Sequence, residues 1–225
     1  MNWSFSSLMI YETCAYRFKL EKIDRLPKLP LPPDNPLERG SRIHERLEHF
    51  VRGTGAMDTE AKQISEFHNA LDHMQMLYSD GKVELEGDWL FDTDWNVCDK
   101  KDVWLWSKLD FFVRDGNHGI VGDYKTGRSQ YKAVEHVQQM QLYAAAAALR
   151  YPDIERLTVE LWYLDEGHVR PLEFTQEQAL TFVGRFDARA KKIFDEKLWR
   201  PNPSRDTCRY CPYSPRGTGA CPAGV

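Results

Sequence analysis

The feature that most constrains this chain is a pair of apolar segments, each of which carries charged residues. Segment 106–113 contains Asp110, and segment 119–127 contains Asp123 and Lys125. Both segments are strand-like, and an Asp-Gly-Asn triplet typical of a hairpin turn lies between them. We therefore expect two neighbouring strands that hold the two aspartates at similar depths in one sheet.

Alternation along the second segment determines which side chains meet. Successive side chains of a strand point to opposite faces, so Asp123 and Lys125 share a face and Tyr124 points away. Carboxylate oxygens suit Mg²⁺ or Mn²⁺, and a nearby ammonium group can hold or polarise a water molecule. Solvated charges on an exposed hairpin are the alternative interpretation. The spacing favours a divalent-cation site beside a phosphodiester.

The composition allows one domain with a substantial core, because 42% of the 225 residues are hydrophobic. A net charge of −4 argues against a basic protein that coats nucleic acid, yet it permits local basic patches. Patches beside the motifs are the better candidates for phosphate contacts, among them Arg42 and Arg128. A further patch comprises Arg200, Arg205, Arg209 and Arg216. With no apolar run of about 18 residues and no secretory signal pattern, we expect a cytoplasmic protein without a membrane partner.

Periodicity predicts the order of the elements. Helices are expected over 4–24, 38–51, 58–79, 131–149 and, after a cap at Thr175, to about 198. Strands are expected over 83–91, 103–113, 118–124, 156–164 and 168–174. Five prolines make 26–36 a loop, and 200–225 is expected to be irregular. This order predicts a mixed α/β layer fold.

A histidine on the second predicted helix is a candidate third metal ligand. His44 and Glu48 lie four residues apart, so they share a helix face. A lone helical histidine is more often a satisfied core residue, but two aspartates committed to a cation favour a neutral imidazole as the next ligand. Glu48 is expected to orient His44 or to position a second ion. The carbonyl of Tyr124 is a further candidate ligand.

The helix after the charged strand carries Gln139 and Tyr143, again four residues apart. An amide and a phenol can hydrogen-bond phosphate or stack on a base without sequence preference, so both are candidates for contacts with nucleic acid. A helix rim with Tyr143 partly in the core is the alternative. The remaining histidines lack comparable neighbours and are expected to be structural or superficial.

Cysteine spacing predicts a second metal centre. Three thiols lie within fourteen positions, at Cys208, Cys211 and Cys221, and Cys14 is the candidate fourth. Four thiolates suit either a structural zinc or an iron–sulfur cluster, and spacing does not separate the two. Such ligation would clasp the two ends of the chain together. Unligated thiols are the alternative, and Cys98 is expected to be a free thiol.

Taken together, these motifs resemble the RecB-like branch of the PD-(D/E)XK nuclease superfamily in its iron–sulfur form, similar to the AddB nuclease domain and the CRISPR-associated adaptation exonucleases. The resemblance runs over nearly the whole chain. Its motifs, in order, are Ser6-x-Leu8-x-x-Tyr11-x-x-Cys14, Gly40-x-x-x-His44-x-x-Leu47-Glu48, Asp110, Asp123-Tyr124-Lys125-Thr126-Gly127, Gln139-x-x-x-Tyr143, and Cys208, Cys211 and Cys221. Each motif alone is common, whereas six in this order are specific.

The resemblance implies a restriction-endonuclease-like core in a single nuclease domain over 1–225. Residues 38–198 would form a helical insertion and the catalytic core, and 1–25 with 200–225 would form the cysteine clasp. It implies a DNA exonuclease acting on single strands or ends. The metal ligands would be His44, Asp110 and Asp123, the catalytic lysine Lys125, and the four cysteines the ligands of a structural 4Fe–4S cluster.

Two features depart from the family pattern. Nine residues separate Cys211 from Cys221, a longer gap than is usual there. The phosphate-binding loop of a helicase is absent, so the domain would act alone or with a separate helicase or recombination protein. A structure-specific DNA endonuclease and a non-catalytic metal-cluster module that binds DNA are the rival hypotheses.

Overall fold

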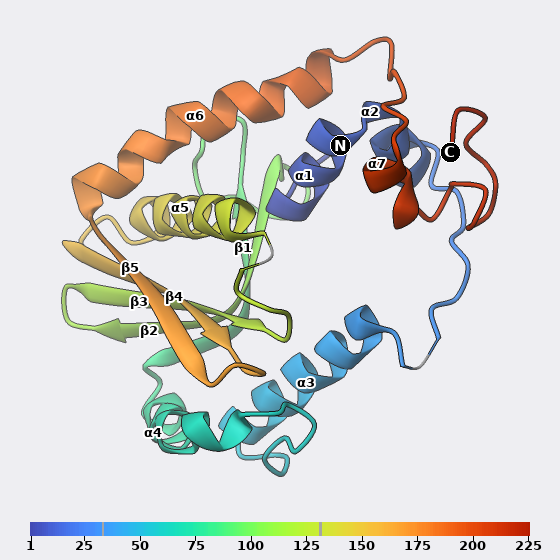
Figure 1. The fold of residues 1–225 in the computed structure, drawn as a ribbon. Helices are drawn as coiled ribbons and strands as arrows, with labels where there is room; N and C mark the ends of the chain where they lie inside the picture. Colours follow the sequence, from blue (N-terminus) through green and yellow to red (C-terminus); the bar gives the residue numbers. More distant parts are fainter. Residues whose placement is uncertain (33, 131) are drawn as a thin grey trace. The chain divides into compact units, whose positions relative to one another are not determined.

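The computed structural model describes residues 1–32, 34–130 and 132–225. They form two compact units (Figure 1). The first, here called the sheet unit, contains Met1–Asn2 and Pro33–Gly184; the second, the cysteine unit, contains Trp3–Pro32 and Arg185–Val225. Among the described residues, none of the helices combines the length and apolar character that crossing a membrane requires.

The sheet unit is built on five strands in the order β1-β2-β3-β4-β5. Their bounds are β1 Val83–Phe91, β2 Leu105–Asp115, β3 His118–Lys125, β4 Arg156–Tyr163 and β5 His168–Thr175. Strands β3 and β4 pair in parallel, and all other neighbours are antiparallel. The parallel pair needs a crossover, which helix α5 (Ala133–Arg150) provides. The mixed sheet with flanking helices confirms the predicted α/β class.

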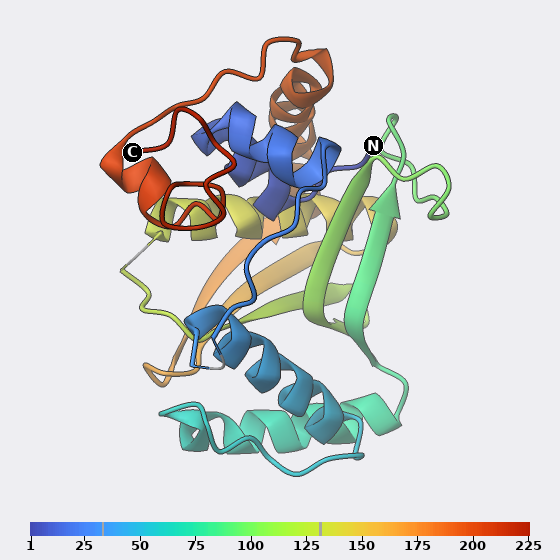
Figure 2. The ribbon, with the colours of Figure 1, turned by 90° about the vertical axis from the view of Figure 1, so that its right-hand side faces the viewer.

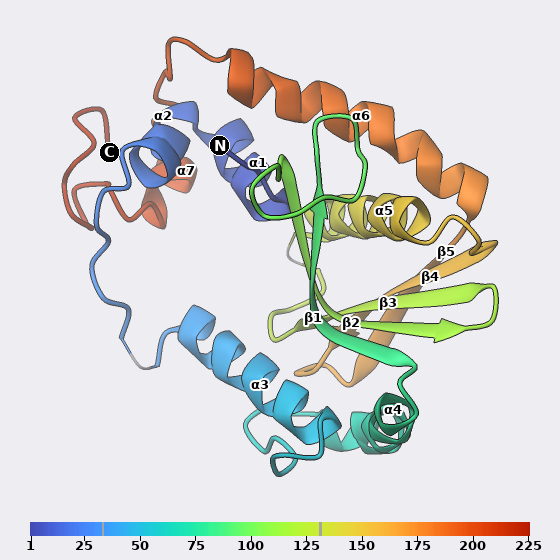
Figure 3. The ribbon, with the colours of Figure 1, turned by 180° about the vertical axis from the view of Figure 1, so that it is seen from behind.

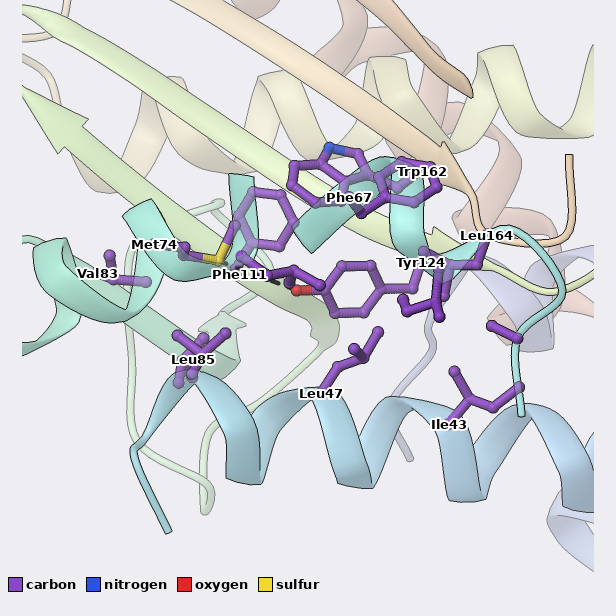
Figure 4. Close-up of a cluster of buried hydrophobic side chains, with 14 of the residues drawn as sticks. Ile43, Leu47, Phe67, Met74, Val83, Leu85, Phe111, Tyr124, Trp162 and Leu164 are labelled. Atoms are coloured by element: carbon purple, nitrogen blue, oxygen red, sulfur yellow. Dashed lines mark hydrogen bonds between the residues drawn. The ribbon is translucent and has the colours of Figure 1, made fainter. Parts of the chain in front are cut away.

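Helices cover both faces of this sheet. Figure 2 shows α5 on one face and α3 (Pro36–Val51) with α4 (His68–Ser79) on the other. The apolar side chains of α3 and α4 join those of the sheet in one core, drawn in Figure 4. Arg39 of α3 also binds Asp165, between β4 and β5, through two hydrogen bonds of 2.7 and 2.9 Å. Apolar packing and this bidentate pair together hold α3 against the sheet.

The predicted helix over 58–79 is wrong in its first turns. A short 3₁₀ helix, Ile64–Phe67, precedes α4, and 58–63 is irregular. The carboxylate of Asp58 accepts hydrogen bonds from the backbone N–H groups of Glu60 and Ala61, at 2.9 and 2.8 Å. An aspartate that binds its own local backbone in this way competes with helix formation.

The other predicted elements of the sheet unit agree to within a few residues. Strand β2 begins at Leu105 rather than 103, and the long hairpin of β1 and β2 is seen from behind in Figure 3. The helix expected from 131 begins at Ala133, and Tyr131 itself lies outside the described residues.

The cysteine unit contains α1 (Phe5–Thr13), α2 (Ala15–Phe18) and a π-helical turn, η1 (Lys19–Ile23). The single helix predicted over 4–24 is therefore interrupted. At the break, Cys14 adopts an extended conformation (φ −160°, ψ 104°), and its sulfur caps α2 by accepting from the N–H of Arg17. The cap turns Cys14 inward, where its side chain is buried.

The C-terminal half of the cysteine unit begins within α6 (Gln176–Asp195), which ends a few residues before the predicted boundary. A short helix, α7 (Arg205–Arg209), lies in the tail that was expected to be irregular. Trp199 stacks on Phe18 with ring centroids 5.8 Å apart, and Tyr213 donates a hydrogen bond to the carbonyl of Leu26. These contacts join the two ends of the chain within this unit.

Candidate active site

Asp110 of β2 and Asp123 of β3 occupy facing positions in the sheet. The register pairs Phe111 with Gly122, and the two aspartates follow at the next position outward from the hairpin turn. Asp110 accepts a hydrogen bond of 2.6 Å from the backbone N–H of Tyr124. Burial raises the pKa of Asp110, and the charge of Asp123 raises it further. Asp123 is buried and the side chain of Asp110 nearly so, and two carboxylates whose charges act on each other in this way favour the binding of a cation.

His44 reaches this pair from helix α3. Its Nδ1 lies 2.9 Å from Oδ1 of Asp110, and its ring packs edge-on against Tyr124. Ile43 and Leu47 beside it are fully buried in the core, which fixes the face that α3 presents. Burial alone lowers the pKa of His44, but the hydrogen bond and charge of Asp110 outweigh it and raise that pKa.

Lys125 lies on the same face of β3 as Asp123, as the alternation predicts. Its ammonium forms an ion pair with Oδ2 of Asp123 and donates to Oε1 of Gln139 at 3.0 Å. The amide of Gln139 in turn donates to Asp123 Oδ1 at 3.2 Å and to the hydroxyl of Tyr143 at 2.8 Å. Helix α5 thus holds both charged groups of the strand in place.

The hydroxyl of Tyr143 lies 2.8 Å from Asp123 Oδ1 and 2.8 Å from the carbonyl of Lys108. Only 3% of this residue is exposed. Its ring is therefore not available to stack on a base, contrary to the sequence-based expectation. The structure gives Tyr143 a different task, which is to fix the orientation of Asp123.

Tyr124 points to the opposite face and enters the hydrophobic core beside Phe111 and Trp162 (Figure 4). Only 4% of it is exposed, and its hydroxyl lies 3.9 Å from the sulfur of Met74. One strand thus supplies both the charged site and the core behind it.

The donor set fits a divalent cation. Oδ2 of Asp123 is buried and faces the ammonium of Lys125, and a second carboxylate and an imidazole lie beside it. In the part of the chain that the structure describes, no three His, Cys, Asp or Glu side chains converge closely enough to hold a metal ion as they stand. Instead, Lys125 and His44 balance the two carboxylates.

A comparison with protein families decides the class of this chain. Residues 2–216 match the model of the PD-(D/E)XK nuclease superfamily. The chain belongs to this superfamily. It is accordingly a nuclease, of a family whose members typically use divalent metals such as Mg²⁺ or Mn²⁺.

Solved structures align with this chain at low sequence identity. An exonuclease candidate from Eubacterium rectale aligns with a TM-score of 0.52 and 9% identity, over 93% of this chain and 85% of its own. The protein SSO0001 aligns with a TM-score of 0.48 and 16% identity, over 100% of this chain and 87% of its own. A phage-related exonuclease from Haemophilus somnus aligns with a TM-score of 0.34 and 10% identity, over 87% of this chain and 94% of its own. Comparison with curated proteins gives no sequence match.

Three other residues singled out in this PD-(D/E)XK chain lie apart from the central network. Arg42 of α3 forms an ion pair with Glu60 at 2.7 Å, and Arg128 is exposed in the segment that follows β3. Glu48 does not orient His44 among the described residues, since its carboxylate binds Arg52 at 2.8 Å. The i,i+4 arginine is the nearer and stronger partner for that carboxylate.

Glu86 is a neighbour of the site that the sequence did not reveal. It faces Asp110 across β1 and β2, at the one position that the ladder skips, and its φ is +50°. Burial raises the pKa of Glu86, the hydrogen bond from Lys108 at 2.6 Å opposes this, and the charge of Asp110 raises it further. Only the strand register, which the sequence alone does not fix, would have indicated this residue.

His136 of α5 is a second neighbour that was missed. Its Nδ1 lies 2.7 Å from the hydroxyl of Tyr163, the residue that faces Lys125 across β3 and β4. Burial lowers the pKa of His136, and the charge of Lys125 lowers it further. Its position one helical turn before Gln139 was the available sequence signal.

The cysteine unit brings the four predicted cysteines to one pocket. Cys14, Cys208, Cys211 and Cys221 all line it, and all are free thiols. The sulfur of Cys14 also accepts from the N–H of Asn202 at 3.4 Å. Cys98 belongs to the sheet unit. As they stand, no three of these thiols converge closely enough among the described residues to hold a metal ion.

Proposed function

We propose that this PD-(D/E)XK nuclease is a divalent-metal-dependent DNA exonuclease of the RecB-like iron–sulfur branch, acting on single-stranded DNA or DNA ends. The observation that carries the proposal is a pair of adjoining networks, His44–Asp110 at one strand and Asp123–Lys125–Gln139 at the next. A binding module would gain nothing from burying two facing carboxylates beside a lysine, because each costs desolvation energy.

In this proposal, His44, Asp110, Asp123 and the carbonyl of Tyr124 hold Mg²⁺ or Mn²⁺. When bound, the ion would polarise the scissile phosphate and lower the pKa of a water molecule. The ammonium of Lys125 orients the attacking water and stabilises the negative charge that develops on the phosphate oxygens. Gln139 holds Lys125 in reach, and Tyr143 keeps Asp123 in one orientation.

The cysteine unit has a structural part in the proposal. Cys14, Cys208, Cys211 and Cys221 would bind a 4Fe–4S cluster, with a structural zinc as the alternative, and so join the two ends of the chain. The support is their common pocket and the backbone N–H groups of Arg17 and Asn202 that point at the Cys14 sulfur. Unpaired thiols accord with a reducing, cytoplasmic setting.

The test uses single-stranded DNA labelled at either end, with Mg²⁺, Mn²⁺ or a chelator. We expect metal-dependent shortening from one end by the wild type and none by Lys125→Ala or Asp123→Asn, with circular dichroism unchanged. Lys132→Ala is the matched control, because Lys132 lies exposed just before α5 and pairs only with Glu135 among the described residues. Cleavage by Lys125→Ala at the wild-type rate would refute the assignment, and equal cleavage of circular strands would indicate an endonuclease.

A further inference from the structure

The last segment of the cysteine unit, 199–225, carries an unbalanced positive charge. It contains four arginines and a single acidic residue, Asp206. All four arginines are exposed, and among the described residues none of them forms an ion pair: Arg200, Arg205, Arg209 and Arg216. The N-terminal part of the same unit is different, because its cations are paired: Glu21 forms ion pairs with Arg17, Lys22 and Lys28.

An exposed aromatic ring stands among these arginines. Tyr210 is 77% exposed, which is unusual for a large ring that contributes nothing to the core. The guanidinium of Arg209 lies over it, 5.1 Å from the ring centroid. Arg205 lies four residues before Arg209 on α7 and so shares its helix face.

The backbone beneath this ring is well fixed. Ser204 caps α7 by accepting from the N–H of Thr207 at 3.0 Å, and the buried Cys208 anchors the helix from inside. Tyr210 ends α7, and the N–H of Cys211 binds the carbonyl of Cys208. The ring is thus held outward on an ordered turn.

We propose that Tyr210, Arg205 and Arg209 form a stacking platform for single-stranded nucleic acid. This proposal rests on the proposed function, because the strand that the platform binds would be the substrate of the nuclease. A base stacks on the open face of the ring, while the guanidinium groups bind the flanking phosphates. This alternation of ring and positive charge matches the alternation of base and phosphate. An acidic protein surface would use the arginines but would have no use for the ring.

The test measures the binding of a short fluorescein-labelled oligothymidylate by anisotropy, with Asp123→Asn present in every protein to prevent cleavage. Tyr210→Ala should raise Kd roughly tenfold, and Tyr210→Phe, which keeps the ring, should bind as tightly as the parent. Arg205→Gln and Arg209→Gln should each reduce the slope of log K against log salt by about 0.7. Lys101→Gln, an exposed cation of the sheet unit, should change neither.

Two results of the binding assay would overturn the platform. One is wild-type affinity in Tyr210→Ala; the other is weakening by the arginine variants alone, which would indicate a purely electrostatic surface for an acidic partner. Because Tyr210 lies between two cysteines, photocrosslinking of an iodouracil-substituted oligonucleotide to the protein with native Tyr210 provides evidence independent of folding. The adduct should map to the peptide that contains Tyr210, and adducts found only elsewhere would also overturn it. Cleavage of the same strand by the wild type reports separately on the proposed function.

Discussion

Gly122 lies so close to the ring of Phe111 that there is no room for a side chain, so a substitution there tests the packing of the sheet directly. A Cβ atom added there would lie 1.8 Å from Cζ of Phe111 and 2.1 and 2.3 Å from its two Cε atoms. The Phe111 ring cannot step aside, because it is 1% exposed and packs against Tyr124 and Trp162, with centroids 5.5 and 5.3 Å away.

The cost of Gly122→Ala follows from two opposing terms. Overpacking a filled core destabilises a protein by about 1–3 kcal/mol, whereas replacing a strand glycine recovers roughly 0.5–1 kcal/mol of backbone entropy. Because the added methyl group would overlap the Phe111 ring, the overpacking cost lies at the upper end of that range, and we expect the free energy of unfolding to fall by about 2 kcal/mol. For a chain of this length, that lowers Tm by roughly 4–8 °C.

Thermal unfolding followed by circular dichroism measures the effect, and cleavage assays should show a slower enzyme because Asp123 is the next residue. Gly184→Ala is the matched control. It lies within α6 with nothing inside 4 Å of its added Cβ, so it should stabilise the protein by about 0.5–1 kcal/mol. Phe111→Leu, combined with Gly122→Ala, should recover part of the loss. A Gly122→Ala protein as stable as the wild type would refute the packing described for this sheet.

Three further outcomes are expected. Tyr143→Phe should lower the free energy of unfolding by about 1–3 kcal/mol, because it removes the buried hydroxyl that lies between Asp123 Oδ1 and the Lys108 carbonyl and that accepts from the amide of Gln139; denaturant titration measures it. Burial raises the pKa of Asp165, but the hydrogen bonds of Arg39 outweigh it and lower that pKa. The stabilising contribution of Asp165 is therefore present above its unfolded pKa of about 3.9 and lost as the pH falls through the folded value, so Asp165→Asn should be less stable than wild type at neutral pH, with the difference vanishing in acid. The proposed 4Fe–4S cluster would make anaerobically purified protein brown, and Cys14→Ala should then lose this colour and lose stability before nuclease activity, as visible spectra and unfolding curves would record.

The charged strand was predictable because its geometry depends on local rules alone. A period of two places Asp123 with Lys125 and sends Tyr124 into the core, and the hairpin turn brings Asp110 alongside. Helical spacing likewise predicted that Gln139 and Tyr143 project together.

What the sequence left open depends on long-range pairing or on competition by side chains. Asp58 accepts hydrogen bonds from the backbone that follows it, so the helix predicted from 58 begins later. The side chain of Cys14 caps α2 and so interrupts the helix predicted over 4–24. Glu86 enters the site only because β1 and β2 pair in one particular register. The depth of Tyr143 depends on how α5 packs over the sheet, which a periodic pattern does not specify.

Three of the four side chains proposed to hold the metal ion or orient the water belong to the sheet, whereas His44 lies on a separate helix, α3. Its position therefore depends on how α3 packs, through the buried Ile43 and Leu47 and through the pair of Arg39 with Asp165. Any local unfolding of α3 would remove the imidazole and leave the carboxylates and the lysine in place. Amide hydrogen exchange along α3 would then bound the fraction of time for which the enzyme is competent.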